Sequence, residues 1–211
     1  RRICTNCKID DPLPPAALRH RVGPNSSRAE FLHVGALCAG DLLQVYRQLA
    51  RPPASDLRWL DFGCGCGRVA RHLLGPEAEA RFAVRDLAYT GVDVDRRQIA
   101  WAARHLPGTF AVIPMSPPTA LPGAAFDVIF TISVFTHLDE GPQEAWLGEL
   151  ARLLRPGGLL LATTHAPDIA RSSPGVTPGE LAKLEARGFL FRPSVGPFNE
   201  QSTFHSEAYL R

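Results

Sequence analysis

The chain has 211 residues, of which 45% are hydrophobic and 21% charged, and these values exclude a wholly disordered protein. Its net charge is +2 and its basic residues are scattered, so a nucleic-acid-binding surface is not expected. No apolar run in the sequence approaches the ~20 residues that cross a bilayer, and the sequence shows no basic-then-apolar leader, so we expect neither a membrane anchor nor a secretion signal in it. An odd count of five cysteines, two of them in a glycine loop, favours a reducing cytoplasm.

The N-terminal quarter of the chain differs from the remainder. Residues 1–34 are irregular and proline-rich, and apolar residues then repeat at helical spacing from Gly35 to Ala50. We therefore expect residues 1–55 to form an irregular segment and a cap helix, beside a main domain of residues 56–211.

Two residue pairs in this segment could bind ligands. Cys4 and Cys7 form half of a zinc site, but no second Cys-x-x-Cys follows and structural zinc requires four ligands, so no metal is predicted. Arg19 and Arg21 could contact an anionic substrate, although solvated charges are the simpler interpretation.

Strands and helices alternate in the main domain, joined by short loops. The predicted strands cover residues 57–62, a segment ending at 91–94, 109–113, 126–132 and 159–163. The predicted helices run from about 68 to 75, from 95 to 106 with Asp95 as cap, and from 141 to 155. This alternation predicts a doubly wound α/β fold with a mostly parallel sheet and helices on both faces.

The pattern weakens after residue 165. A helix near 178–186 and a short strand at 189–191 are the only convincing elements there. We therefore expect fewer than seven strands, with residues 189–192 either pairing beside the fifth strand or packing as an isolated extended segment. The sheet is then shortened, or the chain is a piece of a longer protein.

A glycine loop follows the first strand, in the pattern Asp61-x-Gly63-x-Gly65-x-Gly67. Glycines there allow tight turns and close approach of a ligand to backbone amides at a helix N-terminus. The second strand ends in Asp93, whose carboxylate can accept hydrogen bonds from both hydroxyls of a ribose. Ligands of open α/β sheets bind beyond the carboxyl ends of the strands, so the loop and the acid together predict a nucleoside-bearing ligand.

Two kinds of nucleoside ligand compete for this loop. The frame from Gly65 to Ala70 satisfies the dinucleotide pattern G-x-G-x-x-A, but Asp93 lies 28 residues beyond Gly65, against roughly 20 in that fingerprint. That frame also leaves the preceding Asp-x-Gly unexplained. A mononucleoside without a pyrophosphate, whose amino-acid tail lies along the loop, fits the whole pattern better.

Several motifs in this order resemble the class I S-adenosylmethionine-dependent methyltransferases, and more narrowly the bacterial small-molecule methyltransferases. The resemblance spans about residues 57–165 and rests on the loop 61–67, Gly91-Val92-Asp93, Phe126-Asp127, SVFTHL at 133–138 and WLGELARLLRPGG at 146–158. It implies a Rossmann-like methyltransferase fold, which normally has two strands beyond the five counted above.

The resemblance also implies roles for individual residues. The loop, including Cys64, would hold the methionine moiety of S-adenosylmethionine, and Asp93 would hold the ribose. An acidic residue that commonly contacts adenine is replaced here by the segment 114–117. The remaining cofactor contacts implied are Val94, Met115 on the adenine ring, and Ser133 after the fourth strand.

His137 lies beyond the fourth strand and is the candidate catalytic residue. A histidine could remove a proton from a hydroxyl or amine as this group attacks the methyl, although methyl transfer needs mainly alignment and a structural histidine fits too. Trp101 and Trp146 are interpreted as core residues.

The predicted function is in-line methyl transfer to O, N or C of a small molecule such as a sugar, leaving S-adenosylhomocysteine. Nucleic acid is disfavoured because residues 132–135 lack the Asn/Asp-Pro-Pro-aromatic motif of base-methylating enzymes. The alternatives are an NAD(P)-dependent oxidoreductase and a non-catalytic cofactor-binding module.

Overall fold

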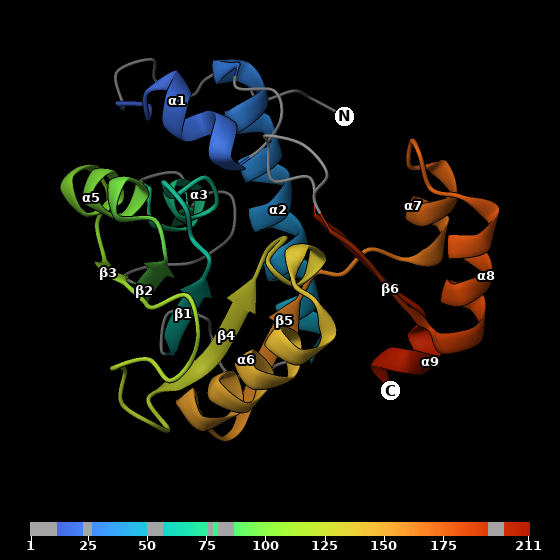
Figure 1. The fold of residues 1–211 in the computed structure, drawn as a ribbon. Coiled ribbons are helices and arrows are strands. Elements are labelled where there is room, and N and C mark those ends of the chain that lie inside the picture. Colours follow the sequence, from blue (N-terminus) through green and yellow to red (C-terminus); the bar gives the residue numbers. More distant parts are fainter. Residues whose placement is uncertain (1–11, 23–26, 50–56, 76–77, 80–86, 194–200) are drawn as a thin grey trace.

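A five-stranded sheet forms the centre of the computed structural model, which describes residues 12–22, 27–49, 57–75, 78–79, 87–193 and 201–211. The strand order is β3-β2-β1-β4-β5, and every neighbouring pair is parallel (Figure 1). The doubly wound α/β fold predicted from the alternating pattern is confirmed. Cys4 and Cys7, the candidate half of a zinc site, lie outside the described residues.

The elements follow each other along the chain in the predicted alternation. The strands of the sheet are β1 (Arg58–Phe62), β2 (Ala88–Asp93), β3 (Thr109–Val112), β4 (Phe126–Thr131) and β5 (Leu154–Ala162). The helices that accompany them are α1 (Ala16–Arg19), the 3-10 turn η1 (His20–Val22), α2 (Arg28–Leu49), α3 (Ala70–Leu74), α5 (Arg96–His105), the 3-10 turn η3 (Phe135–His137) and α6 (Glu140–Leu153). None of the described helices is long and apolar enough to cross a membrane.

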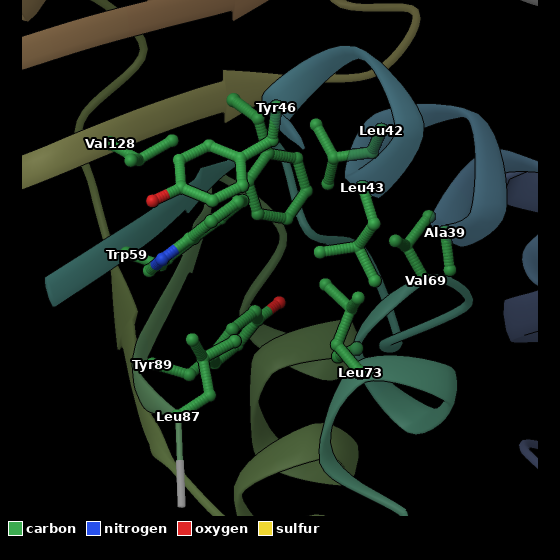
Figure 2. Packing of buried hydrophobic residues seen from close by; sticks show 12 residues of the cluster. Ala39, Leu42, Leu43, Tyr46, Trp59, Val69, Leu73, Leu87, Tyr89 and Val128 are labelled. Carbon is green, nitrogen blue, oxygen red and sulfur yellow. The ribbon is translucent and has the colours of Figure 1, made fainter. Parts of the chain in front are cut away.

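Each face of the sheet is covered by its own apolar cluster. On one face α2 and α3 pack on β1, β2 and β4, and Figure 2 shows Tyr46 of α2 against Trp59 of β1, whose ring centroids are 4.8 Å apart. On the other face α6 packs through Trp146, whose ring centroid is 4.8 Å from that of Phe62. Burial of this apolar area on both faces holds β1 and β4 rigidly in the centre of the sheet.

Two element boundaries differ from those expected from the pattern. Helix α2 begins at Arg28 rather than Gly35, because the Ser27 hydroxyl accepts the backbone N–H of Glu30 and caps the helix earlier. Strand β5 begins at Leu154 rather than residue 159, because Leu154 already pairs with Phe126 before an irregularity in the register.

The C-terminal segment forms an antiparallel pair, which the sequence did not predict. Strands β6 (Phe189–Arg192) and β7 (Ser202–His205) pair with each other, so residues 189–192 neither join the edge at β5 nor stand alone. The helices around this pair are α7 (Pro167–Ser172), α8 (Pro178–Arg187) and α9 (Glu207–Leu210). Among the described residues the main sheet has five strands, fewer than the seven of a complete sheet, and β6 and β7 form a separate two-stranded sheet.

A buried carboxylate holds the connection between β3 and β4. Glu149 of α6 accepts the N–H and hydroxyl of Thr119 at 2.8 and 2.6 Å, and Arg152 donates to it at 2.8 and 2.6 Å. The hydrogen bonds from Arg152 are the largest influence on the Glu149 pKa, which is lowered to about 2.

We expect Glu149→Gln to lower the free energy of unfolding by about 1–3 kcal/mol at neutral pH, because the paired carboxylate is lost. A depressed folded pKa stabilises the protein above the unfolded pKa, and this contribution disappears as pH falls from about 4.5 to 2. Urea denaturation at several pH values measures it. The exposed Glu185→Gln is the control, and an equally small effect of both substitutions would contradict the assigned role.

Candidate functional site

The glycine loop bends sharply between β1 and α3. Gly63, Gly65 and Gly67 have φ values of +84°, +55° and +79°, a region that favours glycine. A β-carbon on Gly63 would lie 2.3 Å from Cγ2 of Val134, and one on Gly65 would lie 2.6 Å from Cγ1 of Val22. The loop therefore requires glycine both for its backbone and for the close approach of neighbouring segments.

Asp93 links the end of β2 to the glycine loop. Its Oδ2 accepts the Gly65 N–H at 2.9 Å, and its Oδ1 accepts the Asp95 N–H at 2.8 Å. Burial raises the pKa of Asp93, and these two amide hydrogen bonds oppose the rise. Each carboxylate oxygen has two lone pairs, so both oxygens can still accept a ligand hydroxyl.

Asp61 lies beneath the loop in the interior. It is 3% exposed, and its Oδ2 accepts the Tyr89 hydroxyl at 2.5 Å. Burial raises its pKa to about 7, while the hydrogen bond from Tyr89 acts in the opposite direction.

The described N-terminal segment 12–22 crosses the loop. Arg68 donates to the backbone oxygen of Val22 at 2.5 Å, and Arg21 forms an ion pair with Asp95 at 2.5 Å. Asp95 also caps α5 as predicted, because its side chain accepts the N–H groups of Arg97 and Gln98. The segment is thus fastened to the turn that precedes α3 and to the N-cap of α5.

Gln98 presents a polar atom without a partner beside the loop. The residue is 4% exposed, and its Oε1 has no hydrogen-bond partner among the described residues. This oxygen lies 2.9 Å from the position that a β-carbon on Gly65 would occupy. A buried unpaired acceptor next to a glycine cradle and a carboxylate fits a ligand that supplies hydroxyl or ammonium donors.

The segment after β4 forms the opposite side of the site. Ser133 has a φ of +62°, and its N–H donates to the Thr163 hydroxyl at 2.7 Å. The next residue, Val134, is the one that approaches Gly63. Nδ1 of His137 donates to the backbone oxygen of Gln201 at 2.7 Å, so the neutral ring presents an unprotonated Nε2.

Two further histidines accompany His137. Burial lowers the pKa of His165, and the charge of His137 lowers it further. Burial also lowers the pKa of His205. Its ring Nε2 is 2.9 Å from Oε1 of Gln143, and its backbone N–H donates to the backbone oxygen of His165 at 2.8 Å. No group of three or more His, Cys, Asp or Glu side chains in the described chain is arranged to hold a metal ion.

The structure brings together most of the residues singled out from the sequence. Asp61, the three loop glycines and Asp93 meet at the carboxyl ends of β1 and β2, and Ser133 and His137 follow β4 next to them. Val94 and Met115 lie at the surface, 42% and 77% exposed, and their contacts with adenine stay a prediction. Cys64 is buried, with its sulfur 2.9 Å from the β-carbon position of Gly91.

The two tryptophans differ in their surroundings. Trp146 is 4% exposed and lies in the core as expected. Trp101 is only half-buried, and its ring stacks on the exposed His105 with a centroid distance of 4.4 Å, so the core interpretation was wrong for this residue.

Gln98, Tyr89 and His165 were missed by sequence reasoning. For Gln98 a signal existed, because residue 98 lies in the first turn of α5, five positions after Asp93, where a side chain can turn toward the glycine loop.

This arrangement is that of a doubly wound α/β domain, with the glycine loop and Asp93 at the carboxyl ends of β1 and β2, the edge at which such folds bind ligands. A family model described as "Methyltransferase domain" matches residues 28–209, and the chain belongs to this family. The match decides against the dinucleotide-dependent oxidoreductase.

Two proteins named as methyltransferases are similar in sequence to about half of this chain. It is 37% identical to a ubiquinone biosynthesis O-methyltransferase of Caulobacter sp. (strain K31), over 54% of this chain and 43% of that protein. It is 37% identical to a malonyl-[acyl-carrier protein] O-methyltransferase of Serratia marcescens, over 51% of this chain and 38% of that protein. The matched region therefore spans less than half the length of these two relatives.

Solved structures support the fold. A methyltransferase of Thermotoga maritima, described as a possible histamine N-methyltransferase, superposes with a TM-score of 0.51 and 19% identity, covering 86% of this chain and 70% of that one. The identity is low, so the likeness concerns the fold alone.

The raised pKa of Asp61 predicts a pH-dependent effect of Asp61→Asn on stability. Because the folded pKa is about 7 and the unfolded one about 3.9, ionisation of Asp61 destabilises the folded protein progressively as pH rises between these values. The variant should gain stability over the wild type by up to about 1.4 kcal/mol per pH unit in this window. Chemical denaturation between pH 4 and 8 measures the difference.

The matched control is Asp168→Asn. In the wild type the Asp168 side chain is 89% exposed and forms an ion pair with Arg171. The difference between this variant and the wild type should stay flat over the same range. A flat difference for Asp61→Asn as well would show that the carboxylate is solvated or paired in the folded protein.

Proposed function

We propose that this chain is an S-adenosylmethionine-dependent methyltransferase that acts on a small molecule. The observation that carries the proposal is the joint placement of the glycine loop and Asp93, tied by the 2.9 Å hydrogen bond from Gly65. Membership of the methyltransferase-domain family supports the same conclusion, as do relatives named as methyltransferases.

The cofactor's parts can be assigned to separate residues. Asp93 would accept the ribose hydroxyls, since its two oxygens are fixed in place by amides of the loop and of α5. The amino-acid tail would lie along Gly63–Gly67, with Cys64 filling space beneath it and Ser133 on the opposite side. Val94 and Met115 would flank adenine, and residues 12–22 would form the cap.

The position of Asp93 also argues against a pyrophosphate. In dinucleotide-binding loops the backbone amides bind the phosphates. Here the Gly65 amide is already bonded to a carboxylate, which would repel a diphosphate placed against it.

Methyl transfer needs an aligned acceptor and, for a hydroxyl, a group that takes its proton. The cofactor would supply an electrophilic methyl on a sulfonium. His137 can accept the acceptor's proton at Nε2, because the backbone oxygen of Gln201 holds the proton on Nδ1. The rigid ends of β1 and β4 would provide the alignment.

The acceptor we propose is a hydroxyl of a small metabolite, such as a sugar or a phenol. The two relatives above are named as O-methyltransferases, and a base such as His137 serves an acceptor that carries a removable proton. The free thiols of Cys38, Cys64 and Cys66 fit a reducing cytoplasm as the place of action.

Binding and turnover test the proposal directly. Calorimetry should show binding of S-adenosylmethionine and no binding of NAD, and a panel of hydroxyl acceptors should release S-adenosylhomocysteine. Binding of the cofactor without turnover across hydroxyl, amine and carbon acceptors would indicate a non-catalytic module instead.

Asp93→Asn should weaken the binding of S-adenosylmethionine by about 10- to 100-fold, because one charged hydrogen bond contributes about 1.5–3 kcal/mol. Calorimetry measures the dissociation constant. Asp168→Asn, at a carboxylate that is 89% exposed, is the matched control, and the affinity of this variant should remain within about twofold of the wild type. Equal affinities of both variants would refute the ribose assignment.

His137→Gln should lower kcat by about 10²- to 10⁴-fold for a hydroxyl acceptor, since the amide cannot take up the proton. The affinity for S-adenosylmethionine should not change. His105→Gln, on the exposed surface of α5, controls for the loss of an imidazole. A kcat within threefold of the wild type would remove His137 from the proton transfer.

A further inference from the structure

Gln98 is buried, and no hydrogen bond from the described residues compensates for the desolvation of its carboxamide oxygen. It belongs to an amphipathic helix, and its carboxamide oxygen has no hydrogen-bond partner among the described residues although the residue is 4% exposed. Leaving such an acceptor unpaired in the interior destabilises a protein. Gln143 provides the contrast: it is 6% exposed, its Nε2 donates to the backbone oxygens of Phe135 and Leu138, and its Oε1 faces His205.

The unpaired oxygen lies beside the glycine that Asp93 holds. It lies 2.9 Å from the β-carbon position of Gly65, whose N–H donates to Asp93. Val22 approaches the same point on Gly65 to 2.6 Å, so the oxygen lies where the loop, the N-terminal segment and the start of α5 meet. Asp93 and the Gln98 oxygen thus flank one glycine.

We propose that Gln98 is a cofactor-binding residue whose Oε1 accepts a hydrogen bond from a ribose hydroxyl of S-adenosylmethionine, next to the hydroxyl contact of Asp93. The ribose is the part of the cofactor that carries hydroxyl donors, and Asp93 places it at this glycine. The same oxygen lacks a partner in the free protein and gains one in the complex.

If Gln98 has this role, Gln98→Met should raise the stability of the free protein and lower its affinity for the cofactor product. Gln98→Met keeps the length of the side chain and removes the unpaired oxygen, so the free protein should become more stable, with its unfolding midpoint raised by about 2–4 °C. The dissociation constant for S-adenosylhomocysteine should rise about three- to tenfold, because a neutral hydrogen bond is lost. Gln143→Met, which removes a satisfied carboxamide, should lower the unfolding midpoint.

Calorimetry with analogues of S-adenosylhomocysteine that lack one ribose hydroxyl identifies the contact. For the analogue without the contacted hydroxyl, wild type and Gln98→Met should bind equally, whereas the other analogue should retain the three- to tenfold difference. Should Gln98→Met not fold, Gln98→Ala carries the same comparison. Unchanged affinity for S-adenosylhomocysteine in the variant, or an equal loss with both analogues, would overturn the proposal.

The role of Gln98 rests on the proposed cofactor and not on the proposed acceptor. The experiment separates failure of the Gln98 role from failure of the cofactor proposal. Absence of S-adenosylhomocysteine binding to the wild type would reject the cofactor itself. Tight binding to the wild type with no change in the variant would reject only Gln98.

Discussion

The hydrogen bond between the Gly65 amide and the Asp93 carboxylate is the constraint on which the site depends. It joins the loop after β1 to the end of β2, two segments 28 residues apart in the chain. The other oxygen of the same carboxylate holds the Asp95 amide at the start of α5. One side chain therefore sets the relative positions of the loop, the strand and the helix before any ligand arrives, which lowers the entropy lost on binding.

This constraint explains why burial of acids is tolerated here. Asp61 and Asp93 both have pKa values raised by burial, and Asp61 feels the charge of Asp93 as well. Tyr89 and the two amides offset part of that cost. Strained or costly features of this kind concentrate at functional sites, where a ligand completes the missing interactions.

The sequence predicted the parts of the fold that depend on local pattern. Short, mostly apolar segments marked β1 and β4, and Gly and Pro marked the ends of α3 and α5, because these signals act within a few residues. The early start of β5 was not predictable in this way, since Leu154 belongs to the sheet only through its pairing with Phe126. The β6–β7 pair depends on the same kind of non-local contact.

In the candidate site too, residues with a local sequence signal were predictable and residues that depend on non-local contacts were not. The glycines and Asp93 were recognisable because a fixed backbone conformation demands them. For Gln98 the sequence offered only its position five residues after Asp93, and the fold was needed to show that its oxygen is buried beside Gly65 and unpaired among the described residues.

The contact between His137 and Gln201 shows that the proposed base and the proposed cofactor site are held by different parts of the chain. The loop, Asp93 and Gln98 all precede residue 100, whereas the carbonyl that selects the tautomer of His137 arrives 64 residues after that histidine. The hairpin bearing β7 adds a second tether, from the Thr203 hydroxyl to the Leu138 backbone oxygen at 2.6 Å. The orientation of the proposed base therefore depends on the C-terminal strand pair, whereas the glycine loop, Asp93 and Gln98 are held by contacts within the first hundred residues.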